Sequence, residues 1–106
     1  MIPKVQITKH HTNAAVQAVL DRYISAGIMS AHSATAVRDA AMPLASNAIK
    51  DLRQSGWTGT EITDYLAEKV ATAHAPLRRL AAEIYVAAWE GMQIDFREQF
   101  GRELGD

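Results

Sequence analysis

The chain of 106 residues contains no cysteine. Disulfide bonds, thiol chemistry and thiolate metal sites are therefore excluded, and the composition is compatible with a reducing compartment. A charge excess of either sign is also missing, because 11 Lys and Arg residues face 12 Asp and Glu residues and leave a net charge of −1. A nearly neutral chain gives no reason to favour nucleic acid, an anionic membrane or a polycationic partner.

Long apolar runs are missing as well. The least polar stretch, residues 24–37, contains serines, a histidine and a threonine, and it is too short to span a bilayer. The first residues, MIPKVQITKHH, lack the apolar run of a signal peptide. We therefore expect a cytoplasmic protein of bacterial or viral type that does not interact with a membrane.

Motifs of the common catalytic and cofactor sites do not occur either. The chain lacks Gly-x-Ser-x-Gly, the P-loop, Gly-x-Gly-x-x-Gly and HExxH. His10 and His11 would point to opposite faces of a strand, a poor arrangement for chelating one metal ion. We expect no metal, no cofactor and no enzymatic activity. The alternative is a small enzyme that uses Glu83 and Glu90, which are seven residues apart and would share one face of a continuous helix.

What is present indicates a small helical protein. Apolar residues make up 48% of the chain, which is ordinary for a globular protein, and the length predicts one domain. Val5 and Ile7 alternate with polar residues, so residues 1–12 are predicted to form an extended segment or a tail. Residues 13–106 follow helical spacing and predict a single all-α domain, a compact bundle of four to five helices.

Residues typical of helix ends predict where these helices begin and end. Thr12 or Asn13 can cap the first helix, and Gly27 can end it by adopting a positive φ. Pro76 suits the first turn of the last helix. Gly91 is a candidate break within that last helix, because an interior glycine costs about 1 kcal/mol relative to alanine.

The second helical segment, residues 33–55, is interrupted by Pro43. Proline inside a helix costs about 3 kcal/mol, because it lacks an N–H and clashes with the previous turn. The apolar stripe nevertheless continues in phase, so we expect either one helix kinked near Met42 or two short helices nearly in line. The members of this stripe are Val37, Ala41, Leu44, Ala48 and Leu52.

Residues 52–66, LRQSGWTGTEITDYL, contain a turn signal. Gly56 can end one helix, and Trp57 can pack back on its last turn. Thr58 and Glu61 have the spacing of a capping box, which would start the next helix. These features predict a connection between two helices without any ligand.

The same fifteen residues are similar to a run found in bacterial helix-turn-helix DNA-binding proteins. This resemblance implies a DNA-binding regulator that uses residues 58–80 as an alternative function. The helical pattern, however, continues past Leu66, where such motifs turn into a recognition helix. The cations available to this alternative site are Lys69, Arg78 and Arg79.

Aromatic and methionine side chains recur at roughly i, i+4 along the last segment, at Tyr85, Trp89, Met92, Phe96 and Phe100. They fit either a central helix or a surface that binds a partner, since such side chains are enriched in interface cores. We expect a non-enzymatic protein that acts by protein–protein interaction as an adaptor, inhibitor or regulator, self-associating as a homodimer. Inhibitors encoded by phages or mobile elements, including anti-CRISPR proteins, are a class of similarly featureless small proteins.

Overall fold

The computed structural model describes residues 9–101. Within that range the chain forms α1 (His10–Ser25), α2 (Ala31–Gln54), α3 (Gly59–Thr72) and α4 (Pro76–Phe100). The predicted all-α bundle is confirmed, with four helices in the described range. Most of the expected extended segment, residues 1–8, lies outside the described residues.

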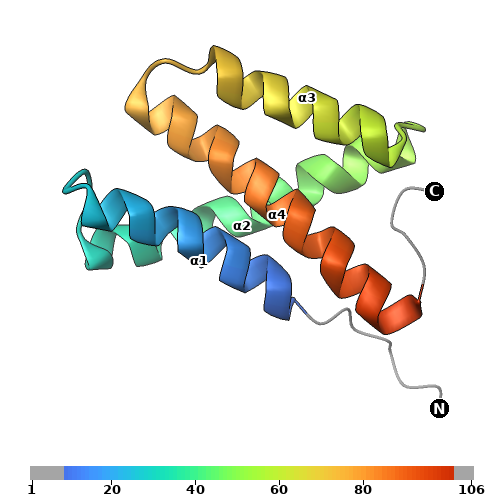
Figure 1. Ribbon diagram of the computed structural model, residues 1–106, viewed down its shortest axis with the longest axis horizontal. Coiled ribbons are helices and arrows are strands. Elements are labelled where there is room, and N and C mark those ends of the chain that lie inside the picture. Colours follow the sequence, from blue (N-terminus) through green and yellow to red (C-terminus); the bar gives the residue numbers. More distant parts are fainter. Residues whose placement is uncertain (1–8, 102–106) are drawn as a thin grey trace.

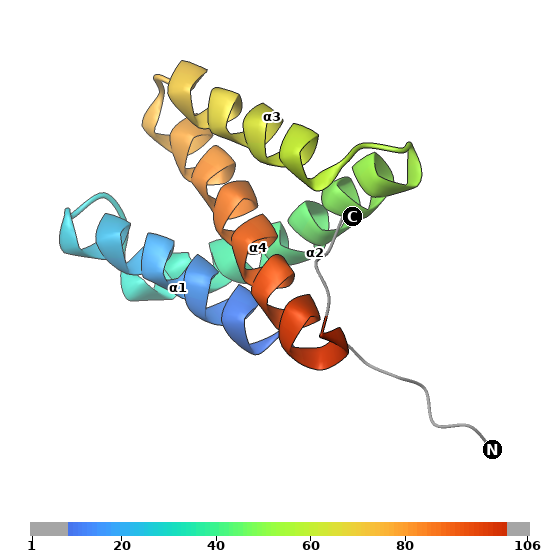
Figure 2. The ribbon, with the colours of Figure 1, turned by 45° about the vertical axis from the view of Figure 1, so that its right-hand side comes forward.

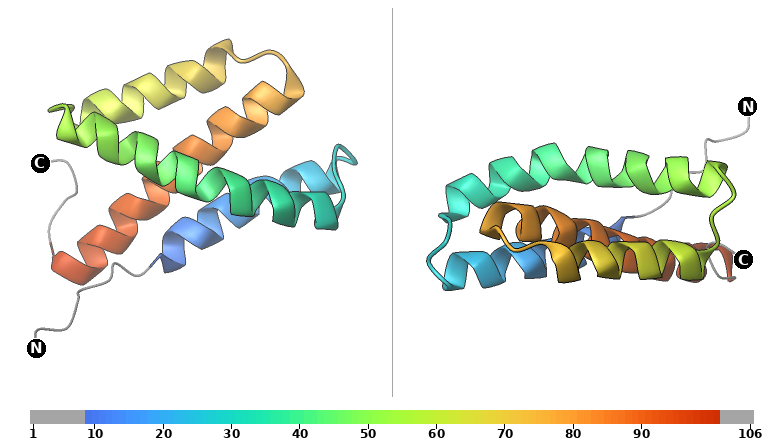
Figure 3. Two further views of the ribbon diagram at one scale, coloured as in Figure 1. Left: turned by 180° about the vertical axis from the view of Figure 1, so that it is seen from behind. Right: turned by 90° about the horizontal axis from the view of Figure 1, so that it is seen from above.

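The four helices form two layers. α1, α4 and α3 lie beside one another in one layer, and α2 runs across them in the other (Figures 1 and 3). The shortest principal extent is 19 Å, about twice the ~10 Å diameter of a helix with its side chains. α4 runs between α1 and α3 (Figure 2) and packs against all three other helices, most extensively against α1. α4 is therefore the central helix.

The helix stop and the helix start between α2 and α3 form as the sequence predicts, whereas the half-buried Trp57 ring contacts the Tyr65 ring of α3, with 5.3 Å between centroids. Gly56 has a φ of +93°, and the Trp57 N–H donates to the Leu52 carbonyl at 3.1 Å. The Thr58 hydroxyl oxygen accepts from the Glu61 N–H, and the Glu61 carboxylate accepts from the Thr58 N–H. This double exchange is a capping box. A helix stop and a helix start thus meet within a few residues.

The two ends of α1 differ in how well the sequence predicts them. Gly27 follows the helix with a φ of +75°, as expected. At the other end, the prediction of a cap at Thr12 or Asn13 is wrong. The helix begins at His10, Lys9 occupies the N-cap position without a side-chain hydrogen bond, and Thr12 lies inside the first turn. The start of α1 must therefore be stabilised from elsewhere in the molecule.

α2 is one continuous helix that contains Pro43, so the alternative of two separate helices is wrong. Figure 3 shows α2 bowed as it passes over the other layer. Pro43 and Asp39, four residues before it, are both exposed. The Asp39 carbonyl, which a proline leaves without its helical partner, therefore faces water that can satisfy it.

The predicted stripe of α2 is wrong at Leu44, whose side chain is 61% exposed. The residues that α2 buries are Ala34, Ala45 and Ile49. Alanines occur on several faces of α2, so helical periodicity does not show whether Leu44 or its neighbour Ala45 points into the core.

The core lies where α4 meets the other helices. Trp89 has the largest fully buried side chain, at 1% exposure. Its indole N–H donates to the Thr63 hydroxyl at 2.9 Å, so the one polar group of this side chain is satisfied. The hydrogen bond also fixes α3 to α4. The rest of the apolar core comes from all four helices.

Gly91 does not break α4, contrary to the sequence-based prediction, because the helix continues through it to Phe100. The glycine instead allows α1 to approach closely. A Cβ atom added at Gly91 would lie 2.4 Å from the Thr12 Cα and 2.8 Å from the His11 carbonyl carbon. No side chain fits in that space, so the contact between the two helices requires glycine.

The close approach predicts the outcome of Gly91→Ala. Helix propensity alone would stabilise the variant by about 1 kcal/mol. Overpacking against the α1 backbone should instead lower the free energy of unfolding by about 1–3 kcal/mol. Urea denaturation followed by circular dichroism measures the difference. Glu90→Ala, at the exposed neighbouring position, is the control and should change stability by less than about 0.5 kcal/mol. A Gly91→Ala protein as stable as the wild type would contradict the prediction.

Candidate interaction site

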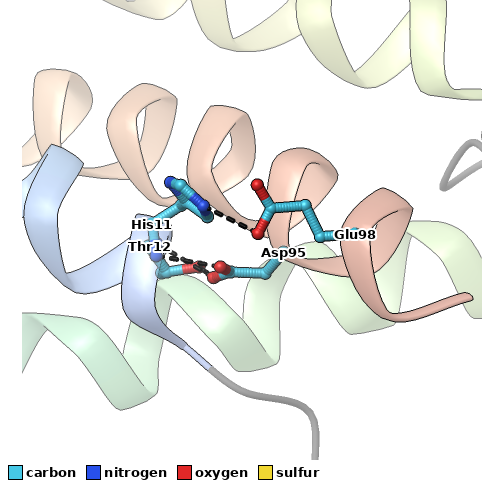
Figure 4. A network of polar contacts seen from close by, with 4 residues as sticks. All are labelled: His11, Thr12, Asp95 and Glu98. Atoms are coloured by element: carbon cyan, nitrogen blue, oxygen red, sulfur yellow. Dashed lines mark hydrogen bonds and ion pairs between the residues drawn. The ribbon is translucent and has the colours of Figure 1, made fainter.

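The first turn of α1 is held by a carboxylate of α4. Asp95 Oδ1 accepts from the His11 N–H at 2.8 Å, while Oδ2 accepts from the Thr12 N–H at 3.0 Å and from the Thr12 hydroxyl at 2.7 Å (Figure 4). Backbone N–H groups in a first helical turn have no partner within their own helix. The positive end of the helix dipole also favours a carboxylate. Asp95 thus caps α1 from another helix.

Burial and hydrogen bonding act on the Asp95 carboxyl in opposite directions. Asp95 is 3% exposed, and this desolvation raises its pKa. The hydrogen bonds from Thr12 and His11 favour the ionised form and outweigh the desolvation, so the pKa lies below the ordinary value of 3.8. The carboxylate is therefore ionised near neutral pH. The nearby pair of His11 and Glu98, at 2.9 Å, is far more exposed and adds little.

The capped end of α1 forms one wall of a groove with a volume of about 590 Å³. We call it the basic groove. Residues of α2 form the opposite wall, and Met92 and Phe96 of α4 lie between the walls. The lining consists of Lys9, Thr12, Ser46, Asn47, Ile49, Lys50, Arg53, Gln54, Met92 and Phe96.

The charges that line the basic groove all have one sign. Lys9 stands at the start of α1, and Lys50 and Arg53 lie one turn apart on α2. No carboxylate lines this groove. Each of the ion pairs found among residues 9–101 involves other cations. The three cations are therefore available to a ligand.

The five residues predicted to bind a partner occupy three different environments. Trp89 is in the core, so its side chain has no surface to offer a partner. Met92 and Phe96 line the basic groove. Phe100 packs on Phe96 with ring centroids 4.6 Å apart and is 42% exposed, so it extends the apolar surface toward solvent. Tyr85 lines a different groove.

The predicted row of side chains is divided because α2 crosses α4 (Figure 3). Ile49 of α2 is fully buried and lines both grooves. On one side of this crossing, α2 faces α3 and Tyr85. On the other side, it faces the start of α1 and Phe96. Helical periodicity places all five side chains on one face of α4, but it does not reveal which part of that face another helix covers.

The second groove, with a volume of about 600 Å³, contains two of the three cations of the DNA-binding alternative. Lys69 and Arg78 line it together with Asp51. The Lys69 Nζ lies 5.2 Å from the centroid of the Tyr65 ring, a cation–π distance. The third cation, Arg79, does not line this groove and donates to Glu83 instead. The structure thus places the predicted DNA-binding cations in two different settings.

The helix-turn-helix resemblance fails at the point that the sequence indicates. α3 continues past Leu66 to Thr72 without the turn that such motifs have there. α4 then begins at Pro76 and returns beside α3 (Figure 1).

The carboxylates of the enzymatic alternative have dissimilar surroundings. Glu83 is mostly buried between α1 and α4, 3.4 Å from the Arg79 Nε and 3.9 Å from a guanidinium nitrogen of Arg22. Burial and the adjacent Glu83 carboxylate raise the pKa of the Tyr23 hydroxyl. Glu90 is exposed. The two carboxylates share a helix face, as the sequence predicts, but not a site.

Among residues 9–101, no three His, Asp or Glu side chains gather closely enough to hold a metal ion. Across the same residues, the helices are either too short or too polar to cross a membrane. No protein-family model, curated protein or solved structure matches the chain.

The basic groove was not predicted from the sequence, although part of its signal is there. Lys50 and Arg53 are three residues apart, so a helix places them on one face. Lys9 joins them only through the packing of α1 on α4. That packing depends on Asp95, which periodicity assigns no particular role. The groove is a product of tertiary structure.

The cap predicts how Asp95→Asn changes stability with pH. The side-chain amide of the variant has one oxygen, which is a weaker acceptor, and an NH2 group, which cannot accept from the three donors of α1. The free energy of unfolding near neutral pH should therefore fall by about 2 kcal/mol. Because folding lowers the pKa of Asp95, its contribution is present above the ordinary pKa of 3.8 and is lost as the pH falls through the folded-state value. The difference between wild type and variant should therefore shrink below pH 3.8.

Urea denaturation at neutral and at acidic pH measures this difference. Glu98→Gln, which changes the exposed carboxylate of the same helix, is the control and should have a much smaller effect at neutral pH. Equal destabilisation by the two variants would argue against the capping role of Asp95.

Proposed function

We propose that the chain acts by binding another protein, as an adaptor, inhibitor or regulator, through the basic groove and the adjoining Phe100. The observation that carries the proposal is an apolar surface, formed by Met92, Phe96 and Phe100, bordered by cations without ion-pair partners among the described residues. Apolar and aromatic centres with polar rims are typical of protein interfaces. An exposed apolar patch is stabilised when a partner covers it.

The charge of the groove argues against a homodimer built on this surface. A two-fold symmetric contact places the same patch of both copies together. Lys9, Lys50 and Arg53 of one copy would then face the same cations of the other, and like charges in an interface are unfavourable. A different protein is the better partner. A phage-encoded inhibitor of a larger host complex is one form that such a protein can take.

Photo-crosslinking and matched alanine variants test this function. A photoreactive phenylalanine analogue at position 100 should crosslink a partner in a host lysate, and the purified partner can then be titrated calorimetrically. Phe100→Ala should weaken its binding about tenfold or more, as for a central aromatic interface residue. Thermal stability should change little, because Phe100 is 42% exposed.

Leu77→Ala is the matched control, because Leu77 is also an exposed apolar residue of α4, at 72% exposure. It lies nineteen positions before Phe96, or about 28 Å along the helix. The control should bind the partner with unchanged affinity. Equal loss of binding in both variants, or a partner that crosslinks only from position 77, would refute the proposed surface.

A further inference from the structure

The chemistry of the basic groove specifies what kind of protein segment fits it. Its floor is apolar, with Met92 and Phe96 four residues apart on α4 and the buried Ile49 beside them. Side chains at this spacing match the i, i+3 and i+4 side chains of a second helix laid in the groove.

The positive charges stand on both walls of this floor. Lys50 and Arg53 are on the α2 wall, and Lys9 is on the α1 wall. A ligand with an apolar ridge flanked by carboxylates would meet apolar atoms in the middle and cations at its edges.

Within residues 9–101, the acidic groups beside the basic groove are not available to pair with its cations. Asp95 lies behind Thr12, where its two oxygens already accept three hydrogen bonds from the first turn of α1. Asp51 lines the other groove. Glu98 is paired with His11. Carboxylates supplied by a partner would therefore find unpaired cations.

We propose that the basic groove binds an acidic amphipathic helix of a partner protein. This inference rests on the proposed function of protein binding and adds the chemistry of the partner. A helix is favoured over an extended strand, because strand addition requires a sheet edge and residues 9–101 contain no strand.

Fluorescence anisotropy with a panel of labelled peptides of about 18 residues tests the proposal, since such helices are about 27 Å long. The acidic peptides carry Leu, Met or Phe at i, i+3, i+4 and i+7 and Glu on both flanks. One control set replaces each Glu with Lys, and another scrambles the apolar positions. Acidic amphipathic peptides should bind saturably, and their affinity should fall as salt increases. The two control sets should bind about tenfold more weakly or not at all.

Two charge-reversed variants locate the binding site. Lys50→Glu with Arg53→Glu should weaken peptide binding about tenfold or more. Lys69→Glu with Arg78→Glu reverses two cations of the other groove and should leave binding unchanged. Circular dichroism of both variants verifies that they fold. The opposite pattern, with loss only in the second variant, would overturn the proposal.

The remaining outcomes identify other occupants and also overturn it. Analytical ultracentrifugation of the wild type and both variants measures the oligomeric state. A wild-type dimer that dissociates only in Lys50→Glu with Arg53→Glu would make a second copy the occupant. Peptide binding that occurs only after deletion of residues 102–106 would assign the groove to the chain's own terminal segment. In a further outcome, duplex DNA or anionic vesicles bind, Lys50→Glu with Arg53→Glu abolishes that binding, and no acidic peptide binds. The occupant would then be another anion and not a helix.

The failure of this inference can be distinguished from failure of the proposed function. If the crosslinked partner depends on Phe100 but no acidic peptide binds, the protein-binding function stands and the acidic helix is refuted. If the partner does not depend on Phe100 either, both proposals fail.

Discussion

The carboxylate of Asp95 holds the start of α1 against α4, and the basic groove depends on that contact. Two backbone N–H groups and one hydroxyl converge on it in a buried site. Gly91, one turn earlier on α4, brings the α1 backbone within reach of the carboxylate. Together these two residues hold the start of α1, which Lys9 immediately precedes, against α4. A polar interaction therefore positions a surface whose centre is apolar.

Much of the fold follows from local sequence signals. The helix stop at Gly56 and the capping box of Thr58 and Glu61 form as their spacing predicts, because each involves residues within a few positions of one another. Pro76 begins α4 for the same kind of reason. The length of α3 follows from local sequence as well, because its helical pattern continues past Leu66 without a turn signal.

Features that depend on distant residues could not be predicted in this way. The cap of α1 comes from Asp95, which is more than eighty positions away, so the residues around Thr12 do not reveal it. Glycine is a residue type that often interrupts a helix, but Gly91 instead leaves room for the α1 backbone. Only the position of α1 distinguishes these two roles. The candidate site shows the same limit: periodicity identified Phe96 and Phe100, yet it could not show that Trp89 lies in the core, where its indole donates to Thr63 of α3.

Ile49 gives the two grooves a common wall, and this has a thermodynamic consequence. A ligand that displaces this side chain in one groove also changes the shape of the other. The effect of each ligand on the affinity of the other must then be equal, because coupling free energies between two sites are reciprocal. A single buried side chain thus borders two faces of a small domain, so a ligand-induced shift of Ile49 in one groove would be shared by the other.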